Sequence, residues 1–243
     1  MTSTPHDSRD TADSPDTPDT AVLFDIDGTL VDSNYAHVDA WSRAFAEVGH
    51  PVDSWRIHRS IGEDSSLLIS GLIGDDADDD LIEKVKDAHT RFYDEHLGDG
   101  GDLHVLDRAT DLLGALAGRG HSVVLATSAP ENELKALRSL LQIEDALWAV
   151  TSSEDVETAK PDPGIVEVAL EKAGVPAAQA IMVGDAVWDV AAAHRAGVRC
   201  IGVLSGGFSR DELVEAGADE VYDDVAGLLD SLDTSLIGRL GRE

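Results

Sequence analysis

The chain has 243 residues, with 48 Asp or Glu and 18 Lys or Arg, and its formal net charge at pH 7 is −30. This charge argues against nucleic acids and anionic membrane surfaces as partners, because both are bound through Lys and Arg side chains that neutralise phosphates. Hydrophobic residues make up 42% of the chain, which is enough for a packed core in spite of the acidity.

The single cysteine, Cys200, excludes an internal disulfide and any metal site built from several cysteines. No apolar run approaches the ~18–20 residues of a membrane-spanning helix. The first residues do not form a basic segment followed by an apolar stretch, so we expect no secretory signal peptide. These features together predict a soluble, cytoplasmic protein.

Residues 1–20 consist mostly of Thr, Ser, Pro and Asp, so we expect a disordered acidic tail. Short runs of aliphatic and β-branched residues then recur along the chain, and runs of this kind are typical of parallel strands covered on both faces. These predicted strands are Ala21–Ile26, Ser122–Thr127, Leu147–Thr151, Ala180–Gly184 and Arg199–Leu204.

Amphipathic helical patterns alternate with the strands after residue 104. The predicted helices are Asp107–Ala117, Pro130–Leu141, Pro163–Ala173 and Val187–Ala196. Strands that alternate with helices favour right-handed crossovers and an open sheet. The sequence therefore predicts an α/β fold with a doubly wound, Rossmann-like parallel sheet.

One long stretch, residues 33–103, interrupts this alternation. It shows helical patterns and no good strand, and its predicted helices are Ser33–Val48, Trp55–Ser60, Ser65–Ile73 and Asp80–Leu97. We interpret it as an inserted all-helical cap domain, with a core domain formed by residues 21–32 and 104–243. The acidic run Asp75–Asp80 lacks the ligand spacing and the closing Glu of a calcium loop, which favours a solvated turn.

Ligands of open parallel sheets bind beyond the carboxyl ends of the strands. Acidic, hydroxyl and lysine side chains lie at the carboxyl ends of the predicted strands or in neighbouring loops: Asp25, Asp27, Thr127, Lys160, Asp185 and Asp189. Each alone is compatible with ordinary turn or cap chemistry. Several buried carboxylates together require a cation, and oxygen ligands without His or Cys favour Mg²⁺. A lysine beside such a cluster suits the binding of an anionic group, so the set predicts phosphoryl transfer.

Four motifs in this order and spacing resemble the haloacid dehalogenase-like superfamily, specifically its phosphoglycolate phosphatase and β-phosphoglucomutase-like branch with a helical cap. They are DIDGTLVDS at Asp25–Ser33, the SAP step after Thr127, AKPDP around Lys160, and GDAVWD at Gly184–Asp189. The resemblance covers about residues 21–225 and implies the fold deduced above from the strand and helix pattern.

The resemblance also implies roles for individual residues. Asp25 would be the nucleophile that forms an aspartyl-phosphate, and Asp27 the general acid and then base. The Asp25 carboxylate, the Asp27 carbonyl and Asp185 would bind Mg²⁺, with Asp189 acting through water.

The phosphoryl oxygens would be held by side chains and by backbone N–H groups. Thr127 and Lys160 would supply the side chains, and the N–H groups around Ile26, Gly28 and Ser128 would complete the cradle.

Cap residues would select the substrate and exclude water when the cap closes. The candidates are His37, Trp41, His58, Arg59, Ile61 and Glu63. We name His37 and Arg59 as substrate-binding candidates, with Arg56 as an alternative to Arg59, while Trp41 and Ile61 are equally compatible with the core of the cap.

The preferred function is a Mg²⁺-dependent phosphatase acting on a small phosphorylated metabolite, with the protein as a monomer. A phosphomutase of the same branch is the first alternative. A mutase would need a cationic cap residue, an Arg, to hold a second phosphate, and this chain has Glu63 at the position that we align with that Arg. Gly184 is also untypical of the mutase. Dehalogenation is disfavoured, because dehalogenases lack an acid equivalent to Asp27. A non-catalytic phosphate-binding module is a remote alternative, because both Asp25 and Asp27 are present.

The composition also carries information about solvent. The chain contains 33 Asp but only 5 Lys, a composition that resembles proteins of salt-in halophiles. An acidic chain selected for solubility alone is the less favoured alternative.

We predict that the melting temperature rises steeply with KCl up to molar concentrations and only weakly with sucrose. Thirty uncompensated negative charges repel one another more in the compact state than in the unfolded chain. The Debye length falls from ~10 Å at 0.1 M to ~3 Å at 1 M salt, while sucrose strengthens apolar burial without screening charge. A melting temperature that is flat or falling between about 0.1 and 2 M KCl, in thermal melts, would remove the halophile interpretation.

Overall fold

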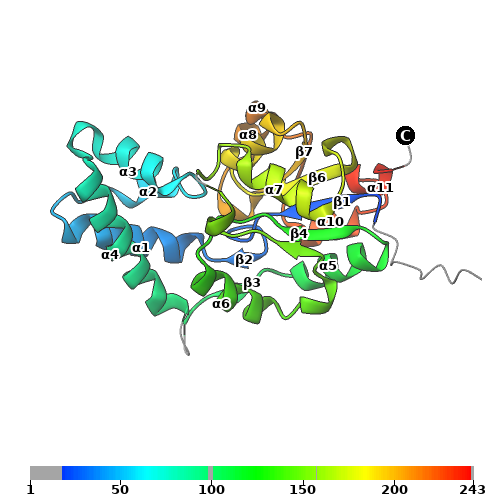
Figure 1. The fold of residues 1–243 in the computed structure, drawn as a ribbon, viewed down its shortest axis with the longest axis horizontal. Coiled ribbons are helices and arrows are strands. Elements are labelled where there is room, and N and C mark those ends of the chain that lie inside the picture. Colours follow the sequence, from blue (N-terminus) through cyan, green and yellow to red (C-terminus); the bar gives the residue numbers. More distant parts are fainter. Residues whose placement is uncertain (1–17, 98–100, 157, 242–243) are drawn as a thin grey trace, which may run out of the picture.

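The computed structural model describes residues 18–97, 101–156 and 158–241. At its centre is a six-stranded parallel sheet with the strand order β5-β4-β1-β6-β7-β8 (Figure 1). In chain order, its strands are β1 (Ala21–Phe24), β4 (Ser122–Leu125), β5 (Ala149–Val150), β6 (Ala180–Gly184), β7 (Arg199–Val203) and β8 (Glu220–Tyr222).

Both faces of the sheet are buried, and successive strand residues alternate between them. In β1, Val22 and Phe24 contribute to one hydrophobic core, while Ala21 and Leu23 contribute to the other. All four side chains are fully buried. This period-two alternation between two apolar cores explains why the strands appear in the sequence as continuous apolar runs.

Helices cover the two faces of the sheet as two separate layers (Figure 1). One layer consists of α5 (Ala109–Gly118), α6 (Glu131–Leu141), α10 (Val225–Asp230) and α11 (Leu236–Arg239). The other consists of α7 (Gly164–Ala173), α8 (Val187–Arg195) and α9 (Arg210–Ala216). The arrangement is the predicted doubly wound α/β fold.

A group of four helices stands beside the sheet, between two short strands (Figure 1). The strands β2 (Val31–Asp32) and β3 (His104–Val105) pair in an antiparallel manner at the entrance and exit of this group. The helices between them are α1 (Asn34–Glu47), α2 (Ser54–His58), α3 (Ser65–Ile73) and α4 (Asp79–Leu97).

The inserted helices have a hydrophobic core of their own. Trp41 and Phe45 of α1 pack with Ile57, Ile69 and Val85 of the other three helices. An independent core is what a separate cap would need. The division of the chain at residues 33 and 103 stays our interpretation of this arrangement.

The predicted strands and crossover helices are confirmed, but several ends differ. β1 ends at Phe24 because the following residues form a tight loop, in which the N–H groups of Leu30 and Val31 both donate to the carbonyl of Ile26. β5 is shorter than Leu147–Thr151. The two-residue strands β2 and β3, the edge strand β8 and helices α9 to α11 were not predicted.

The predicted tail at residues 1–20 lies mostly outside the described residues. Thr20, however, is buried, and its carbonyl accepts a hydrogen bond from Ser122 N at 2.9 Å. This residue therefore belongs to the folded part of the chain, and the tail boundary at residue 20 was placed too late.

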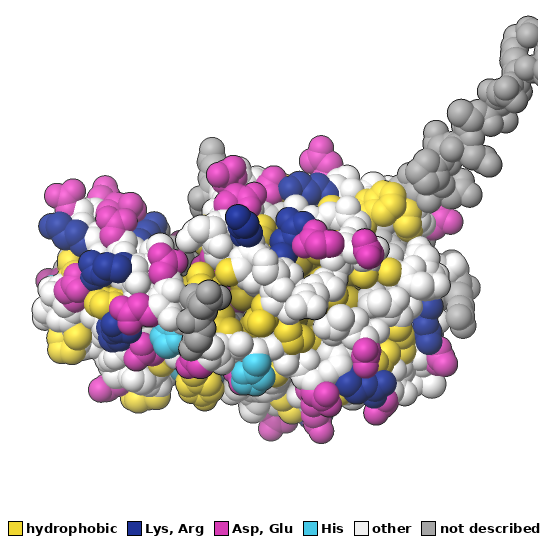
Figure 2. Space-filling view, turned by 90° about the horizontal axis from the view of Figure 1, so that it is seen from below, with side chains coloured by type: hydrophobic (Ala, Val, Ile, Leu, Met, Phe, Trp, Pro, Cys, Tyr) yellow, Lys and Arg dark blue, Asp and Glu magenta, His cyan; other side chains and the backbone are white. Residues whose placement is uncertain are grey.

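The surface shows the effect of the acidic composition. In Figure 2, Asp and Glu side chains are spread over both the cap end and the sheet end of one face, with Lys and Arg among them. Among the described residues, no helix combines the length and the apolarity that a membrane crossing requires.

Candidate active site

The candidate site lies beyond the carboxyl ends of β1, β4 and β6. Asp25 follows β1 directly, and its N–H donates to the carbonyl of Val183 in β6 at 3.0 Å. Asp185 follows β6 in the same way, and Asp189 lies in the first turn of α8. Because β1 and β6 are neighbours in the sheet, these carboxylates come together as the sequence predicts.

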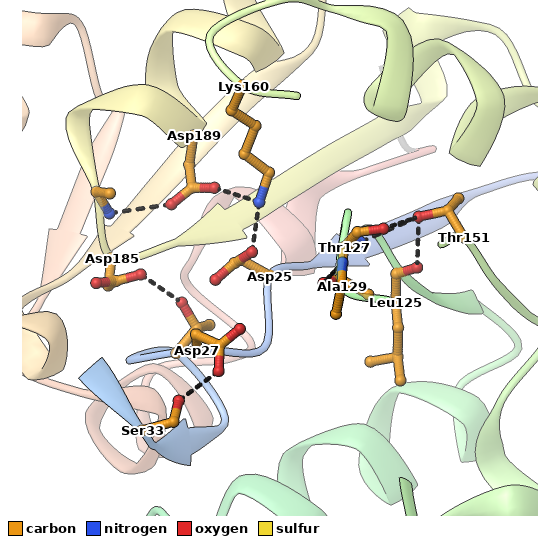
Figure 3. Close-up of polar contacts among 12 residues, drawn as sticks. Asp25, Asp27, Ser33, Leu125, Thr127, Ala129, Thr151, Lys160, Asp185 and Asp189 are labelled. Carbon is orange, nitrogen blue, oxygen red and sulfur yellow. Dashed lines mark hydrogen bonds and ion pairs between the residues drawn. The ribbon is translucent and has the colours of Figure 1, made fainter. Parts of the chain in front are cut away.

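Lys160 lies between two of these carboxylates (Figure 3). Its Nζ is 2.7 Å from Asp189 Oδ1 and makes a close ion pair with Asp25 Oδ1. Lys160 is 3% exposed and Asp189 is 1% exposed. Burial alone would lower the pKa of Lys160, but the charges of Asp189 and Asp25 outweigh burial and raise it, so the ammonium stays charged.

The three carboxylates of Asp25, Asp185 and Asp189 form a compact oxygen cluster. One oxygen from each lies within 4.8 Å of the others. Burial raises the pKa of Asp25 to about 7, opposed by Lys160 and assisted by Asp189. Burial also raises the pKa of Asp185 well above its usual range, and Asp189 and Asp25 raise it further. One ammonium therefore does not balance the cluster, and the buried oxygen donors fit a hard divalent cation such as Mg²⁺.

Two polar side chains orient Asp185. Thr29 Oγ1 donates to Asp185 Oδ1 at 3.2 Å, and Asn34 Nδ2 donates to Asp185 Oδ2 at 3.0 Å. Asn34 Nδ2 also approaches the carbonyl of Gly206 at 3.2 Å. These two neutral donors thus fix the orientation of the Asp185 carboxylate but do not neutralise its charge.

Asp27 points away from this cluster toward the cap. The Ser33 hydroxyl donates to Asp27 Oδ1, and His37 Nε2 of α1 lies 3.4 Å from the same atom. Burial acts to raise the pKa of Asp27, but His37, Ser33 and Lys160 together lower it below its ordinary value. The pKa of Asp25 is thus raised while that of Asp27 is lowered, so the two carboxyls of the first motif lie in different electrostatic environments.

Thr127 is held by the backbone beyond β4. Its Oγ1 accepts from Ala129 N at 3.1 Å, and its N–H donates to Thr151 Oγ1 at 3.0 Å (Figure 3). Ser128, between Thr127 and Ala129 in the sequence, lines the same cavity as Asp25. Thr127 and Ser128 therefore line the cavity beside Asp25, while the N–H groups of Thr127 and Ala129 are used in hydrogen bonds to Thr151 and Thr127.

A cavity of about 370 Å³ joins the cluster to the cap. Among the predicted cap residues, His37, Trp41, Ile61 and Glu63 line it. Arg59 and His58 are not among the described residues that line it.

Arg59 and His58 instead join the cap to the core. Arg59 makes an ion pair with Glu212 of α9, and its guanidinium lies 4.3 Å from the centre of the Phe208 ring. His58 Nε2 is 3.0 Å from the Gly206 carbonyl.

Asp64 makes a third junction of cap and core, next to Lys160. Its N–H donates to the Lys160 carbonyl at 2.7 Å, and its carboxylate accepts from Ala159 N at 3.2 Å. The same carboxylate caps the N-terminus of α3. The cap thus meets the core beside the loop that positions Lys160.

Glycines allow the close approaches within the site. Gly28 has a φ of 71°, and a β-carbon there would lie 2.6 Å from Asp185 Oδ2. A β-carbon on Gly206 would overlap the Asp185 carboxylate, and one on Gly184 would overlap the Asp189 side chain. Any side chain at position 184 would therefore displace Asp189.

Sequence reasoning missed several residues that line or support the site. Thr29 lies within the first motif and Asn34 directly follows it. Their polar side chains beside a predicted active-site loop could have indicated that they support the site. Thr151 gave no signal beyond its place at a strand end. Glu133 lies one helical turn before Leu137 on the apolar face of α6, and an acidic residue at such a position is a usable signal of a site.

Comparison with known proteins agrees with this geometry. The family model described as haloacid dehalogenase-like hydrolase matches residues 20–197. The phosphoglycolate phosphatase of Rhodospirillum rubrum is 37% identical over 221 residues, which cover 87% of this chain and 90% of that protein. That of Pseudomonas putida is 30% identical over 215 residues, covering 86% and 78%. A solved hydrolase from Pseudomonas syringae superimposes with a TM-score of 0.83 at 33% identity, covering 88% of this chain and 98% of that one.

We predict that Gly206→Ala destabilises the protein by about 1–3 kcal/mol, the usual cost of overpacking, because the new methyl group displaces Asp185. The matched control is Gly114→Ala in α5, where the added carbon meets nothing within 4 Å. That variant should keep its stability or gain ~0.5–1 kcal/mol from helix propensity. Urea unfolding of both variants measures the difference. Equal free energies of unfolding for the two would contradict the close packing of Gly206 on Asp185.

Proposed function

Since the chain belongs to the haloacid dehalogenase-like hydrolases, we propose that it is a Mg²⁺-dependent phosphatase that hydrolyses a small phosphorylated metabolite through an aspartyl-phosphate on Asp25. The relatives support a phosphatase acting on phosphate monoesters. The observation that carries the mechanism is the buried ion pair of Lys160 with Asp25 and Asp189, beside the Asp185 carboxylate.

In the first half-reaction, a carboxylate oxygen of Asp25 attacks phosphorus while the bond from phosphorus to the ester oxygen breaks. The leaving oxygen takes a proton from Asp27, whose carboxyl lies on the cap side of the cluster. Lys160, the Thr127 hydroxyl and the Ser128 N–H stabilise the phosphoryl oxygens. Asp25, Asp185 and the Asp27 carbonyl, with support from Asp189, would hold Mg²⁺, which when bound would neutralise negative charge on the phosphoryl group.

In the second half-reaction, Asp27 removes a proton from water, and the water oxygen bonds to phosphorus. The acyl–phosphate bond breaks, inorganic phosphate leaves, and the Asp25 carboxylate is restored. The Ser33 hydroxyl and His37 keep Asp27 ionised and oriented between the two steps.

Phosphoglycolate is the substrate that we propose, because the relatives bear that name and the cavity of about 370 Å³ suits a small metabolite. The phosphomutase alternative needs a cap cation for a second phosphate. Glu63 lines the cavity at the aligned position, which supports hydrolysis over transfer. His37 stays a substrate-binding candidate, while the contacts of Arg59 support a role in joining cap to core.

The direct test is release of inorganic phosphate from 2-phosphoglycolate and from p-nitrophenyl phosphate in molar KCl, with MgCl₂ or with EDTA. We expect release that needs MgCl₂ and a higher kcat/KM for 2-phosphoglycolate. No release from any monoester in MgCl₂ would overturn the phosphatase, and equal release in EDTA would overturn the metal dependence.

We predict that Asp25→Ala abolishes both turnover and the phosphoenzyme, while Asp27→Asn slows turnover by ~10²–10⁴-fold, the usual contribution of general acid–base catalysis. Acid quenching after mixing with ³²P-labelled substrate measures the phosphoenzyme. Asp32→Asn is the matched control, because Asp32 lies in the same motif but is exposed. Turnover by Asp25→Ala or Asp27→Asn at the rate of this control would contradict the assigned roles.

A further inference from the structure

A second group of metal-binding side chains lies where the cap meets the core. Asp27 follows β1, His37 belongs to α1 and Glu133 belongs to α6. His37 Nε2 is 3.4 Å from Asp27 Oδ1 and 3.7 Å from Glu133 Oε1, and the three ligand atoms all lie within 4.8 Å of one another. None of the three side chains is more than 20% exposed.

The surroundings fix the direction of the His37 imidazole. Its other nitrogen, Nδ1, is 3.2 Å from His89 Nε2 of α4, and its ring stacks on Tyr93 at 3.9 Å. Nε2 is therefore left facing the two carboxylates. Histidine ligands of metals are commonly oriented in this way, through a hydrogen bond at the second ring nitrogen.

One buried polar atom beside this group lacks a partner. The Tyr93 hydroxyl is 1% exposed as a residue and has no hydrogen-bond partner among the described residues. Burial raises the pKa of Tyr93, the charges of Asp27 and Glu133 raise it further, and Ser33 lowers it. A water bound to an ion in this group would give that hydroxyl a partner.

We propose that Asp27, His37 and Glu133 form a second, inhibitory metal site for Zn²⁺. In a tetrahedral zinc site with metal–ligand distances of ~2.0–2.1 Å, neighbouring ligand atoms are ~3.3–3.4 Å apart. The distances from His37 Nε2 to the two carboxylates, 3.4 and 3.7 Å, are close to this value. One nitrogen and two carboxylate oxygens suit Zn²⁺ better than Mg²⁺, which prefers six oxygens.

Zinc at this site would stop catalysis in two ways, a consequence that rests on the proposed function. It would hold the Asp27 carboxylate, which then no longer gives or takes a proton. It would also join α1 of the cap to α6 of the core, so the cavity would not open for exchange of substrate and product. The cluster of Asp25, Asp185 and Asp189 would stay free for Mg²⁺.

The test uses Glu133→Gln, with Glu131→Gln as the matched control two residues away on the same helix. Binding is followed at pH 8, in saturating MgCl₂, through the visible absorption of Co²⁺ as a probe for Zn²⁺. Four-coordinate Co²⁺ with a nitrogen ligand absorbs far more strongly than six-coordinate Co²⁺ with oxygen ligands. We expect strong Co²⁺ bands in the wild type and in Glu131→Gln, and we expect added Zn²⁺ to remove these bands by displacing Co²⁺. In Glu133→Gln, Co²⁺ should bind about tenfold more weakly or worse, because the loss of even an outer partner of a metal site lowers metal affinity by ~10–100-fold.

Inhibition of phosphate release by ZnCl₂ at saturating MgCl₂ is the second readout, and its midpoint should rise about tenfold or more in Glu133→Gln alone. Equal inhibition of all three proteins would overturn the proposal, because zinc would then act by replacing Mg²⁺. If Glu133→Gln fails to fold, His37→Gln in the Co²⁺ experiment takes its place, and unchanged bands would overturn the site. A protein with Co²⁺ bands but no phosphatase activity would contradict the proposed function and leave the metal site supported.

Discussion

The buried ammonium of Lys160 is the interaction on which the site depends. It lies between Asp25 and Asp189, with Asp185 in the same cluster, so three buried carboxylates share one buried cation. Moving an ion from water into a protein interior costs several kcal/mol even after relaxation, and only an opposite charge nearby offsets this cost. The raised pKa values of Asp25 and Asp185 express this imbalance. A second cation would complete the balance, and a phosphoryl group would then bind between fixed positive charges.

The rest of the fold serves this cluster. The central position of β1, between β4 and β6, brings Asp25 beside both the Thr127 loop and Asp185. Glycines at 28, 184 and 206 make room for the carboxylates. The cap meets the core at Asp64 and Arg59, and near His37, so the cap residues that line the cavity and Asp27, the proposed proton donor, belong to one junction.

The sequence was sufficient for the framework and for the residues of the cluster. Apolar runs predicted the long strands because both faces of a parallel sheet are buried. Asp25, Thr127 and Asp185 lie at the ends of those runs or directly after them. Elements of two or three residues, such as β2, β3 and β8, carry too few side chains for a periodic signal. The contacts of Arg59 and His58 could not be predicted either, because they depend on how the cap is oriented against α9 and Gly206. Glu133 approaches His37 across the same junction, although they are far apart in the sequence.

The charge imbalance of the cluster is the central claim, and Mg²⁺-dependent stability tests it most directly. Thermal and urea unfolding of the wild type and of Asp185→Asn would be followed against MgCl₂ at a fixed, molar KCl concentration, so that general screening stays constant. We expect MgCl₂ to stabilise the wild type, by ~2.7 kcal/mol at a hundredfold excess over Kd, with little further stabilisation of Asp185→Asn. Equal stabilisation of both proteins, or none of either, would contradict the account.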